Sequence, residues 1–385
     1  MAEIDALDRI RGSLIGGAAG DALGYTIEFM GEDTIFSKYG KEGITEYSLN
    51  MGVAVISDDT QMTLFTANGL LIGDTRGALA EEMSAPHVYV KRAYHDWYLT
   101  QTCTMKEVNK HHRYSEEGGV SWLLDIPELY KHRAPGNTCL SALQENPKTE
   151  DYITHPINNS KGCGGVMRVA PVGLFYNAGA NGPVPIETLD MEGAYVAAIT
   201  HGHDLGFMPA AVITHIVNRI VYPNGKQTLK EIVLEAKKVC QKLFKDFPSL
   251  EELNRCIDLA IELSENDADD LENIHKLGEG WVAEEAMAIA IYCALKYEND
   301  FSKGIIVAAN HNGDSDSTAA ICGNILGAIC GYQAIEAQKK WTECLELRDV
   351  IIELANDLYR GCPMMAGSIE EDETWLRKYV EMRKA

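Results

Sequence analysis

Two short acidic clusters are the residues of this sequence whose types and spacing best suit chemistry. Ser57-Asp58-Asp59-Thr60 and Asp314-Ser315-Asp316-Ser317 each stand just before an apolar run. Either cluster alone could simply cap a helix, because Ser and Asp side chains accept hydrogen bonds from the free N–H groups of a first turn. Two adjacent aspartates exceed what one cap needs, and a hard cation would relieve their repulsion. Together the clusters predict one metal site, and their carboxylate and hydroxyl oxygens favour Mg²⁺ or Mn²⁺ over zinc.

A glycine-rich segment, Ser160-Lys161-Gly162-Cys163-Gly164-Gly165, is a second candidate for binding. Glycines let a backbone approach a ligand closely, and successive N–H groups can form a nest for an anion. No strand–turn–helix unit surrounds the segment, so it is neither a Walker loop nor a dinucleotide fingerprint. From its residues alone, a phosphate loop and a close-packing turn are equally consistent.

The elements that must position these clusters are helices. Around residues 282–295, small and apolar residues recur at i, i+4 in two neighbouring rows, which indicates a helix buried against other helices. Similar patterns predict helical segments at 14–22, 194–199, 210–220, 229–244, 253–263, 305–309, 319–334 and 345–358. Only 43–56 could hold a short extended piece, and 102–160 is expected to contain long loops. We therefore predict one all-α domain over residues 1–385, although the length alone suggests two or three domains.

Composition excludes some classes of function. Lys and Arg number 34 against 57 Asp and Glu, a net charge of −23, so general binding to nucleic acid or an anionic membrane surface is not expected. The ten cysteines include no Cys-x-x-Cys pair, which is typical of reduced thiols in a cytosol. The first residues lack an apolar signal core, and the stretch at 319–334 is too short to span a bilayer. We expect a soluble, cytoplasmic monomer.

The sequence resembles the ADP-ribosylglycohydrolase family, which includes ADP-ribosyl-arginine hydrolases and dinitrogen-reductase-activating glycohydrolases. The matching motifs follow the family order between residues 9 and 335. They are Gly16-Gly17-Ala18-Ala19-Gly20-Asp21-Ala22-Leu23-Gly24, Glu28-Phe29, Ser57-Asp58-Asp59-Thr60-Gln61-Met62, residues 162–171, Thr200-His201-Gly202-His203 and residues 313–319. Each motif is common alone, but their combination is specific.

The resemblance implies a compact orthogonal bundle of helices with a binuclear metal cleft that holds two divalent cations, Mg²⁺ or Mn²⁺. The family's metal ligands fall on Ser57, Asp58, Asp59, Asp314, Asp316 and Ser317. Its substrate contacts fall on Ser160, Lys161, Gly162, Cys163 and Gly164 for the diphosphate, on His201 beside the distal ribose and, by a weaker match, on Asn137. Cys163 departs from the family's usual asparagine or alanine, which a backbone contact would tolerate and a side-chain contact would not.

The implied activity is metal-dependent hydrolysis of the N-glycosidic bond of ADP-ribosylated arginine in a protein substrate, with release of ADP-ribose. Asp58, Asp59 or the family's mobile glutamate, here Glu28, would transfer the proton, and the sequence leaves the choice among them open. Two alternatives remain. One is hydrolysis of another ADP-ribosyl linkage (serine, nucleic-acid base or O-acetyl-ADP-ribose), and the other is a non-catalytic ADP-ribose-binding relative. All six ligand positions are filled, which favours activity.

Overall fold

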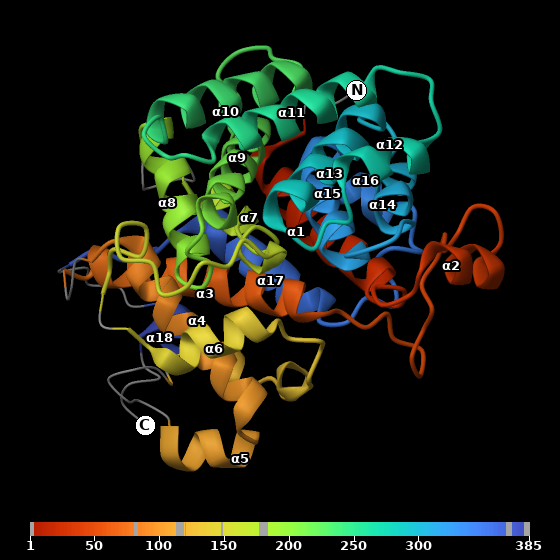
Figure 1. Cartoon of the computed structure of the whole chain (residues 1–385). Coiled ribbons are helices and arrows are strands. Elements are labelled where there is room, and N and C mark those ends of the chain that lie inside the picture. The colour runs from red at the N-terminus through yellow and green to blue at the C-terminus, as the bar shows by residue number, and fades with distance from the viewer. Residues whose placement is uncertain are drawn as a thin grey trace.

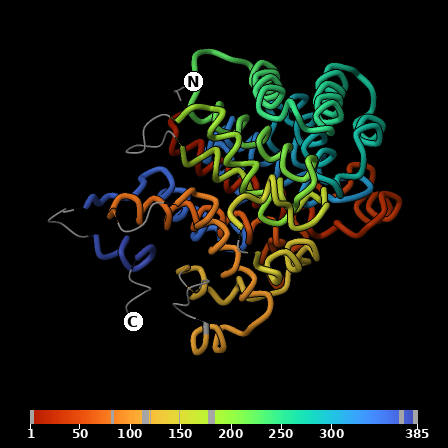
Figure 2. Tube along the Cα trace, turned by 60° about the vertical axis from the view of Figure 1, so that its left-hand side comes forward, coloured from red at the N-terminus to blue at the C-terminus, as the bar shows by residue number. Residues whose placement is uncertain are grey.

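Two small-residue helices, α1 (Ala6–Gly24) and α15 (Ser315–Cys330), run side by side through the centre of the molecule (Figures 1 and 2). The computed structural model describes residues 4–80, 84–112, 119, 121–147, 149–176, 184–366 and 372–380. Within these ranges the regular structure is helical, and strand pairing is limited to isolated bridges. The predicted all-α fold is thus confirmed.

The other helices surround this central pair. They are α2 (Glu32–Tyr39), α3 (Asp58–Ala78), α4 (Pro86–Thr102), α5 (Met105–Glu107), η1 (Val108–His112), η2 (Trp122–Asp125), η3 (Pro127–Tyr130), α6 (Asn137–Glu145), η4 (Cys163–Gly165), α7 (Ala170–Phe175), α8 (Ile186–Ala198), α9 (Asp204–Val221), α10 (Leu229–Leu243), α11 (Leu250–Ser264), α12 (Asp270–Leu277), α13 (Ala283–Lys296), α14 (Phe301–Ala309), α16 (Tyr332–Glu336), α17 (Arg348–Arg360) and α18 (Glu373–Tyr379). In both views α10 and α11 lie at one end, α4 and α5 at the other, and α2 projects from the side (Figures 1 and 2).

Glycines bring α1 and α15 into backbone contact. A β-carbon added at Gly16 would lie 2.3 Å from the carbonyl oxygen of Gly323, and one added at Gly20 would lie 2.0 Å from that of Ala319. No side chain fits at such distances, so the four-residue spacing of small residues lets the two helices touch directly. This contact places the start of α15, which carries one acidic cluster, beside the end of α1.

We expect Gly20→Ala to destabilise the protein by about 3 kcal/mol or more, because a methyl group would meet backbone rather than a movable side chain. Gly77→Ala is the matched control, since Gly77 also lies in a helix but an added β-carbon there meets nothing within 4 Å. That substitution should raise stability by up to about 1 kcal/mol through helix propensity. Urea unfolding of both variants measures the difference, and equal stabilities would contradict the tight packing.

Two of the predicted segments have different bounds in the structure. The 319–334 pattern is divided at Gly331, whose φ of +77° ends α15 before α16 begins. The 345–358 pattern starts later, at Arg348, after Leu347 takes a φ of +57°. Residues 43–56 form no strand and contribute only bridges, Asn50 to Val53 and Ala54 to Leu345. In the described part of residues 102–160, four short helices and α6 lie between irregular stretches, as expected of a loop-rich region.

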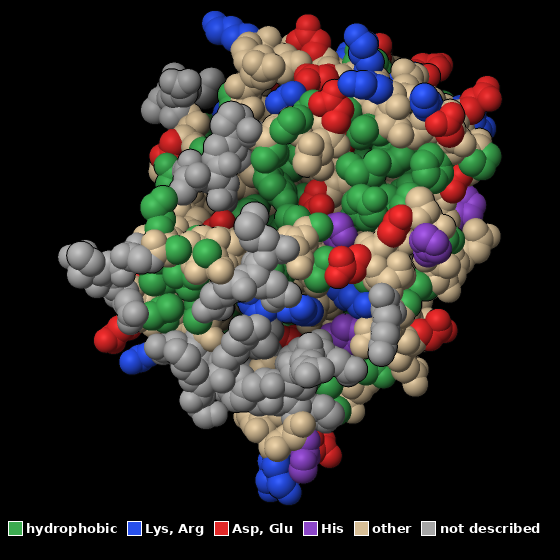
Figure 3. All heavy atoms as spheres, turned by 90° about the vertical axis from the view of Figure 1, so that its left-hand side faces the viewer, with side chains coloured by type: hydrophobic (Ala, Val, Ile, Leu, Met, Phe, Trp, Pro, Cys, Tyr) green, Lys and Arg blue, Asp and Glu red, His purple; other side chains and the backbone are tan. Residues whose placement is uncertain are grey.

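The surface carries charges of both signs. On the face seen in Figure 3, Lys and Arg side chains are interspersed with Asp, Glu and apolar side chains. Among the described helices, none has both the length and the apolar character needed to cross a membrane.

Candidate active site

The two acidic clusters begin two helices whose N-termini meet at one cleft. Ser57 caps α3 by accepting a hydrogen bond from the Asp59 N–H at 3.1 Å. Asp314 caps α15 by accepting one from the Ser317 N–H at 3.2 Å. The helix caps expected from sequence are therefore present. Beyond the caps, the aspartates share a cavity of about 560 Å³.

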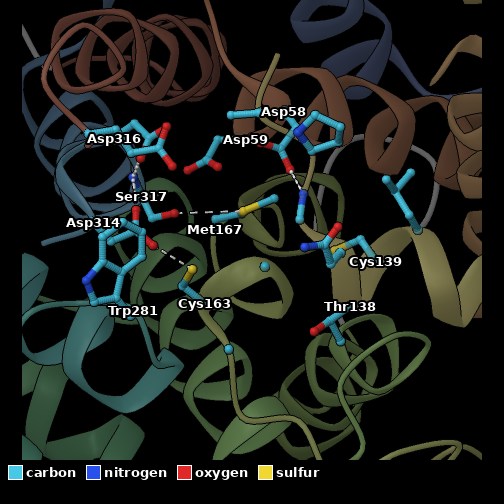
Figure 4. Close-up of a pocket in the computed structure, with 18 of the residues that line it drawn as sticks. Asp58, Asp59, Thr138, Cys139, Cys163, Met167, Trp281, Asp314, Asp316 and Ser317 are labelled. Atoms are coloured by element: carbon cyan, nitrogen blue, oxygen red, sulfur yellow. Dashed lines mark hydrogen bonds between the residues drawn. The ribbon is translucent and has the colours of Figure 1, made fainter. Parts of the chain in front are cut away.

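The cavity is lined by residues from segments far apart in the chain. The sequence-predicted residues that line it are Glu28, Asp58, Asp59, Asn137, Gly162, Cys163, Gly164, His201, Asp314, Asp316 and Ser317. Ser57, Ser160 and Lys161 are not among its lining residues. In Figure 4 the Asp58, Asp59 and Asp316 side chains lie along one side of the pocket, and Cys163 lies across from them.

Asp21 of α1 holds the start of α3 in place, a role that the sequence analysis did not assign. Its fully buried carboxylate accepts from the Ser57 N–H at 2.9 Å and 3.1 Å. It also accepts from the Thr60 N–H at 3.1 Å and from the Thr60 hydroxyl at 2.5 Å. A buried acid among small apolar residues was the available signal, because such a group needs partners. Asp21 therefore positions Asp58 and Asp59 without lining the cavity.

Burial and mutual repulsion raise the pKa values of these carboxyls. Burial, followed by the charges of Asp21 and Asp314, raises the pKa of Asp58 to about 8. Burial together with neighbouring aspartates raises the pKa of Asp316 and that of Asp59 well above the usual range. Burial, with the nearby aspartates, raises the pKa of Glu28 to about 9. Ionising these carboxyls together therefore costs free energy, and a bound cation would offset that cost.

The donor atoms suit a hard cation. Buried oxygens of Asp59 (Oδ2) and Glu28 (Oε2) have no hydrogen-bond partner, which is costly unless another group binds them. Carboxylates and the Ser317 hydroxyl form an all-oxygen set, the type that Mg²⁺ and Mn²⁺ prefer. In the described part of the chain, no three His, Cys, Asp or Glu side chains are already arranged to hold a metal ion. The residues fit such an ion chemically, and side-chain adjustment would be needed to ligate it.

The glycine-rich segment crosses the cleft opposite the aspartates as the short helix η4. It is fixed to the start of α13, where the Cys163 N–H donates to the Trp281 carbonyl at 3.1 Å and the Ala283 N–H donates to the Lys161 carbonyl at 2.8 Å. The Lys161 ammonium turns away from the cavity and pairs with Glu284. The predicted contact of Lys161 with a substrate therefore cannot use its side chain in this arrangement.

Cys163 contacts the second acidic cluster directly. Its thiol donates a hydrogen bond to Asp314 Oδ2 at 2.7 Å, drawn as a dashed line in Figure 4. Burial, reinforced by the Asp314 charge, raises the pKa of this thiol well above its usual range. The group is consequently a neutral thiol, and its backbone N–H is engaged by Trp281. Gly162 and Gly164 both line the cavity, and the Gly162 N–H donates to Ser160 Oγ at 3.3 Å.

His201 packs against the glycine-rich segment. Its Nδ1 lies 2.8 Å from the Thr200 hydroxyl, which accepts a hydrogen bond from Arg168 Nη2 at 2.6 Å. Its Nε2 lies 3.3 Å from where a β-carbon at Gly162 would be, so any larger residue at that position would crowd the ring. Burial, with a smaller effect from Arg168, lowers the pKa of His201 to about 3. A neutral imidazole therefore presents Nε2 to the cavity.

A third wall comes from residues 132–140, most of which the sequence analysis missed. Asn137 lines the cavity together with Pro135 and Thr138. The Gly136 N–H donates to Asp58 Oδ2 at 3.2 Å. The sequence analysis assigned only Asn137 of this wall, and Pro135 and Gly136 are residues typical of a rigid turn.

Two exposed aromatic rings stand at the mouth of the cavity. Phe29 and Trp281 stack with ring centroids 6.2 Å apart, and they are 75% and 40% exposed. Phe29 directly follows Glu28, so the stacking holds the end of the segment that carries this glutamate. Nothing in the sequence paired these two rings, because 252 positions separate them.

Comparisons with known proteins identify relatives over most of the chain. The family model described as ADP-ribosylglycohydrolase matches residues 2–366. A protein from Archaeoglobus fulgidus is 29% identical over 51% of this chain, and the match covers 57% of that relative, somewhat over half of its length. The ADP-ribosylarginine hydrolase Tri1 of Serratia proteamaculans is 24% identical over 94% of this chain and 81% of its own. A solved structure, an ADP-ribosylglycohydrolase-related protein complex, matches with a TM-score of 0.59 at 22% identity, over 93% of this chain and 99% of that one.

Proposed function

Because the chain belongs to the ADP-ribosylglycohydrolase family, we propose that it hydrolyses the N-glycosidic bond between ADP-ribose and an arginine side chain. The observation that carries this proposal is the meeting of two aspartate clusters, a glycine-rich segment and a neutral histidine in one cavity. Oxygen ligands, backbone N–H donors and an imidazole are the groups that a ribose, a diphosphate and a hydrolytic reaction require.

The proposed cofactor is a pair of divalent cations, Mg²⁺ or Mn²⁺. The residues that would hold them are Ser57, Asp58, Asp59, Asp314, Asp316 and Ser317. When bound, such cations polarise oxygen atoms and lower the pKa of water. Ser57 is buried and caps α3, and it does not line the cavity. Its hydroxyl would therefore bind a cation from the side of the aspartates that faces away from the cavity.

The remaining groups would bind and orient the substrate. The N–H groups of the glycine-rich segment suit an anionic diphosphate because they need no basic side chain to provide positive potential. Nε2 of His201 faces the same space, where it would hydrogen-bond to a ribose hydroxyl. Lys161 would act through its backbone, since its ammonium pairs with Glu284.

Glu28 is the strongest candidate for holding the proton that the leaving nitrogen needs. Burial, with the charges of the nearby aspartates, raises its pKa and so favours its protonated form. It is a buried residue of the cavity lining, next to Phe29 in sequence, whereas Asp58 and Asp59 begin α3 and are among the proposed ligands. Glu28 is not among the six proposed ligands, so its carboxyl would be the one left to transfer a proton.

Arginine is the proposed leaving group because the Tri1 relative, which matches most of this chain, is described as an ADP-ribosylarginine hydrolase. The ten cysteines are all free thiols, which fits action in a reducing cytoplasm.

Parallel assays with two substrates test the proposal. Peptides carrying ADP-ribose on arginine or on serine are offered with Mg²⁺, and free ADP-ribose is measured by chromatography. We expect release from arginine to be faster by tenfold or more, about 1.4 kcal/mol of discrimination. Cleavage of the serine peptide alone would refute the arginine assignment, and ADP-ribose binding without cleavage of either peptide would indicate a non-catalytic relative.

A further inference from the structure

Glu346 joins two segments that border the acidic cluster of α3. This residue lies between α16 and α17, about 290 positions from that cluster in sequence, and its side chain is 6% exposed. Its backbone N–H donates to the Ala54 carbonyl at 3.0 Å, and the Ala54 N–H donates to the Cys344 carbonyl at 2.8 Å. Its carboxylate Oε2 also accepts from the Ile56 N–H at 3.3 Å. Residues 54–56, which lead into Ser57, are therefore hydrogen-bonded to residues 344–346.

The same carboxylate binds the third wall of the cavity. Arg133 Nη2 donates to Glu346 Oε1 at 2.9 Å and lies 3.3 Å from Oε2. The Arg133 side chain is 13% exposed, so this ion pair is shielded from water and both partners would be costly to leave unpaired. Lys131 lies further from Oε1, at 3.7 Å, and is mostly exposed.

Arg133 is in turn bonded to the acidic cluster through its backbone. Its carbonyl accepts from the Asp58 N–H at 3.0 Å. Three residues later, the Gly136 N–H donates to Asp58 Oδ2 at 3.2 Å. Between them Ala134 has a φ of +53°, a left-handed conformation that costs an alanine free energy and persists only where neighbouring contacts impose it. The Glu346–Arg133 pair is the ion pair next to this strained residue.

We propose that Glu346 is a positioning residue of the active site, which holds Arg133 so that residues 133–136 fix the Asp58 carboxylate from one side and Ile56 fixes its helix from the other. The expected effect of Glu346 on catalysis rests on the proposed function. The charge-dependent link between residues 344–346 and 133–136 does not depend on that function. Partners that orient metal ligands typically change metal affinity or activity by about 10-fold to 100-fold.

Glu346 also holds the charged end of the Arg133 side chain in place. The Nε of the Arg133 guanidinium is buried without a hydrogen-bond partner, and its Nη2 forms the ion pair with Glu346. Burial raises the pKa of the nearby Tyr25, and the Arg133 charge opposes this rise. Without the Glu346 charge, this shielded guanidinium would lose its ion-pair partner, which is costly.

The variant Glu346→Gln tests this proposal. It keeps an oxygen acceptor for Ile56 and the shape of the side chain but removes the charge that binds Arg133. Glu343→Gln is the matched control, because Glu343 lies three residues away on the surface, 62% exposed. Three properties are measured on the full chain: Mn²⁺ affinity by electron paramagnetic resonance, kcat and KM for the arginine-linked peptide, and hydrogen exchange of the peptides that cover 54–60 and 131–138.

We expect Glu346→Gln to weaken Mn²⁺ binding and to lower kcat by about tenfold or more, with faster exchange at 131–138 and little change in KM. Arg133→Gln should reproduce these effects, whereas Glu343→Gln should show none of them. Unchanged exchange at 131–138 and unchanged Mn²⁺ affinity in Glu346→Gln would overturn the proposal. If the wild-type chain bound no Mn²⁺ and released no ADP-ribose, the proposed function would fail, and the exchange data would still decide whether the link exists.

Discussion

Replacing Asp316 with asparagine is expected to abolish hydrolysis while making the metal-free protein more stable. Asp316 is 3% exposed, and its pKa is raised by burial and by the charges of Asp59, Asp314 and Glu28. A metal ion in a catalytic site is worth several kcal/mol of transition-state stabilisation. Since each 1.36 kcal/mol corresponds to a factor of ten, the loss of a proposed ligand should cost about 10²-fold to 10³-fold or more in kcat.

The gain in stability has a separate cause. The Oδ1 atom of Asp316 accepts a hydrogen bond from the Ser317 N–H at 3.0 Å, and the asparagine amide oxygen can keep it. The substitution then removes one of several mutually repelling carboxyls, keeps this hydrogen bond and creates no cavity. Relief of this repulsion should raise the Tm of the metal-free protein by about 2 °C to 4 °C for each kcal/mol gained.

Activity assays and thermal unfolding without added metal measure the two effects. Asp349→Asn is the control, because Asp349 lies in the first turn of α17 as Asp316 lies in that of α15, but it is exposed. It should leave turnover unchanged. If Asp316→Asn kept more than a tenth of the wild-type turnover, the assignment of Asp316 as a metal ligand would be wrong.

The second large effect is a loss of stability at alkaline pH that divalent cations reverse. The pKa of Asp58 is raised from 3.8 to about 8, and that of Glu28 from 4.5 to about 9. Both acids therefore hold protons in the folded protein after the unfolded chain has lost them. The stability that these two acids contribute is fully present below their pKa values in the unfolded chain. It is lost as the pH rises through their pKa values in the folded protein.

His201 acts in the opposite direction over a lower range. Its pKa falls from 6.5 to about 3 on folding, so its contribution is present above pH 6.5 and is lost as the pH falls. The interval from pH 7 to 9 therefore isolates the carboxyls. Each proton that only the folded state still holds costs about 1.4 kcal/mol of stability per pH unit, which corresponds to a fall in Tm of about 5 °C to 10 °C over this interval.

Thermal scans in chelator and in excess Mg²⁺ or Mn²⁺ test this expectation. In chelator the Tm should fall between pH 7 and pH 9. With a divalent cation bound, the carboxylates are stabilised in their charged form and the fall should be much smaller, because a ligand that binds only the folded state stabilises it. A Tm that depends on pH equally with and without divalent cations would contradict a metal site at these residues.

Much of the architecture could be predicted from the sequence because its determinants are local. Helices follow from the spacing of apolar residues, and the aspartate clusters begin helices because Ser and Asp cap free N–H groups at any helix start. The apolar pattern did not predict the helix boundaries at Gly331 and Leu347, although their cause is also local. A single left-handed residue interrupts each helix, and an apolar pattern continues across it unchanged.

The candidate site was predictable where chemistry is carried by a motif. Asp58, Asp59, Asp314, Asp316 and the residues of the glycine-rich segment that line the cavity all belong to short runs of unusual composition. Lys161 was assigned to the substrate because it belongs to such a run, yet its side chain points to Glu284. A motif specifies which backbone segment is present, but the direction of each side chain depends on its neighbours.

The sequence by itself determined the helices, the clusters and the kinds of atoms they offer. Only the tertiary structure decided that α3 and α15 open onto the same cavity, because the contact of α1 with α15 depends on backbone approach at glycines such as Gly20. It also decided that Asp21 and Glu346 hold the α3 cluster in place. Such buried carboxylates have no recognisable pattern of their own, since their partners are backbone N–H groups, which every residue except proline provides.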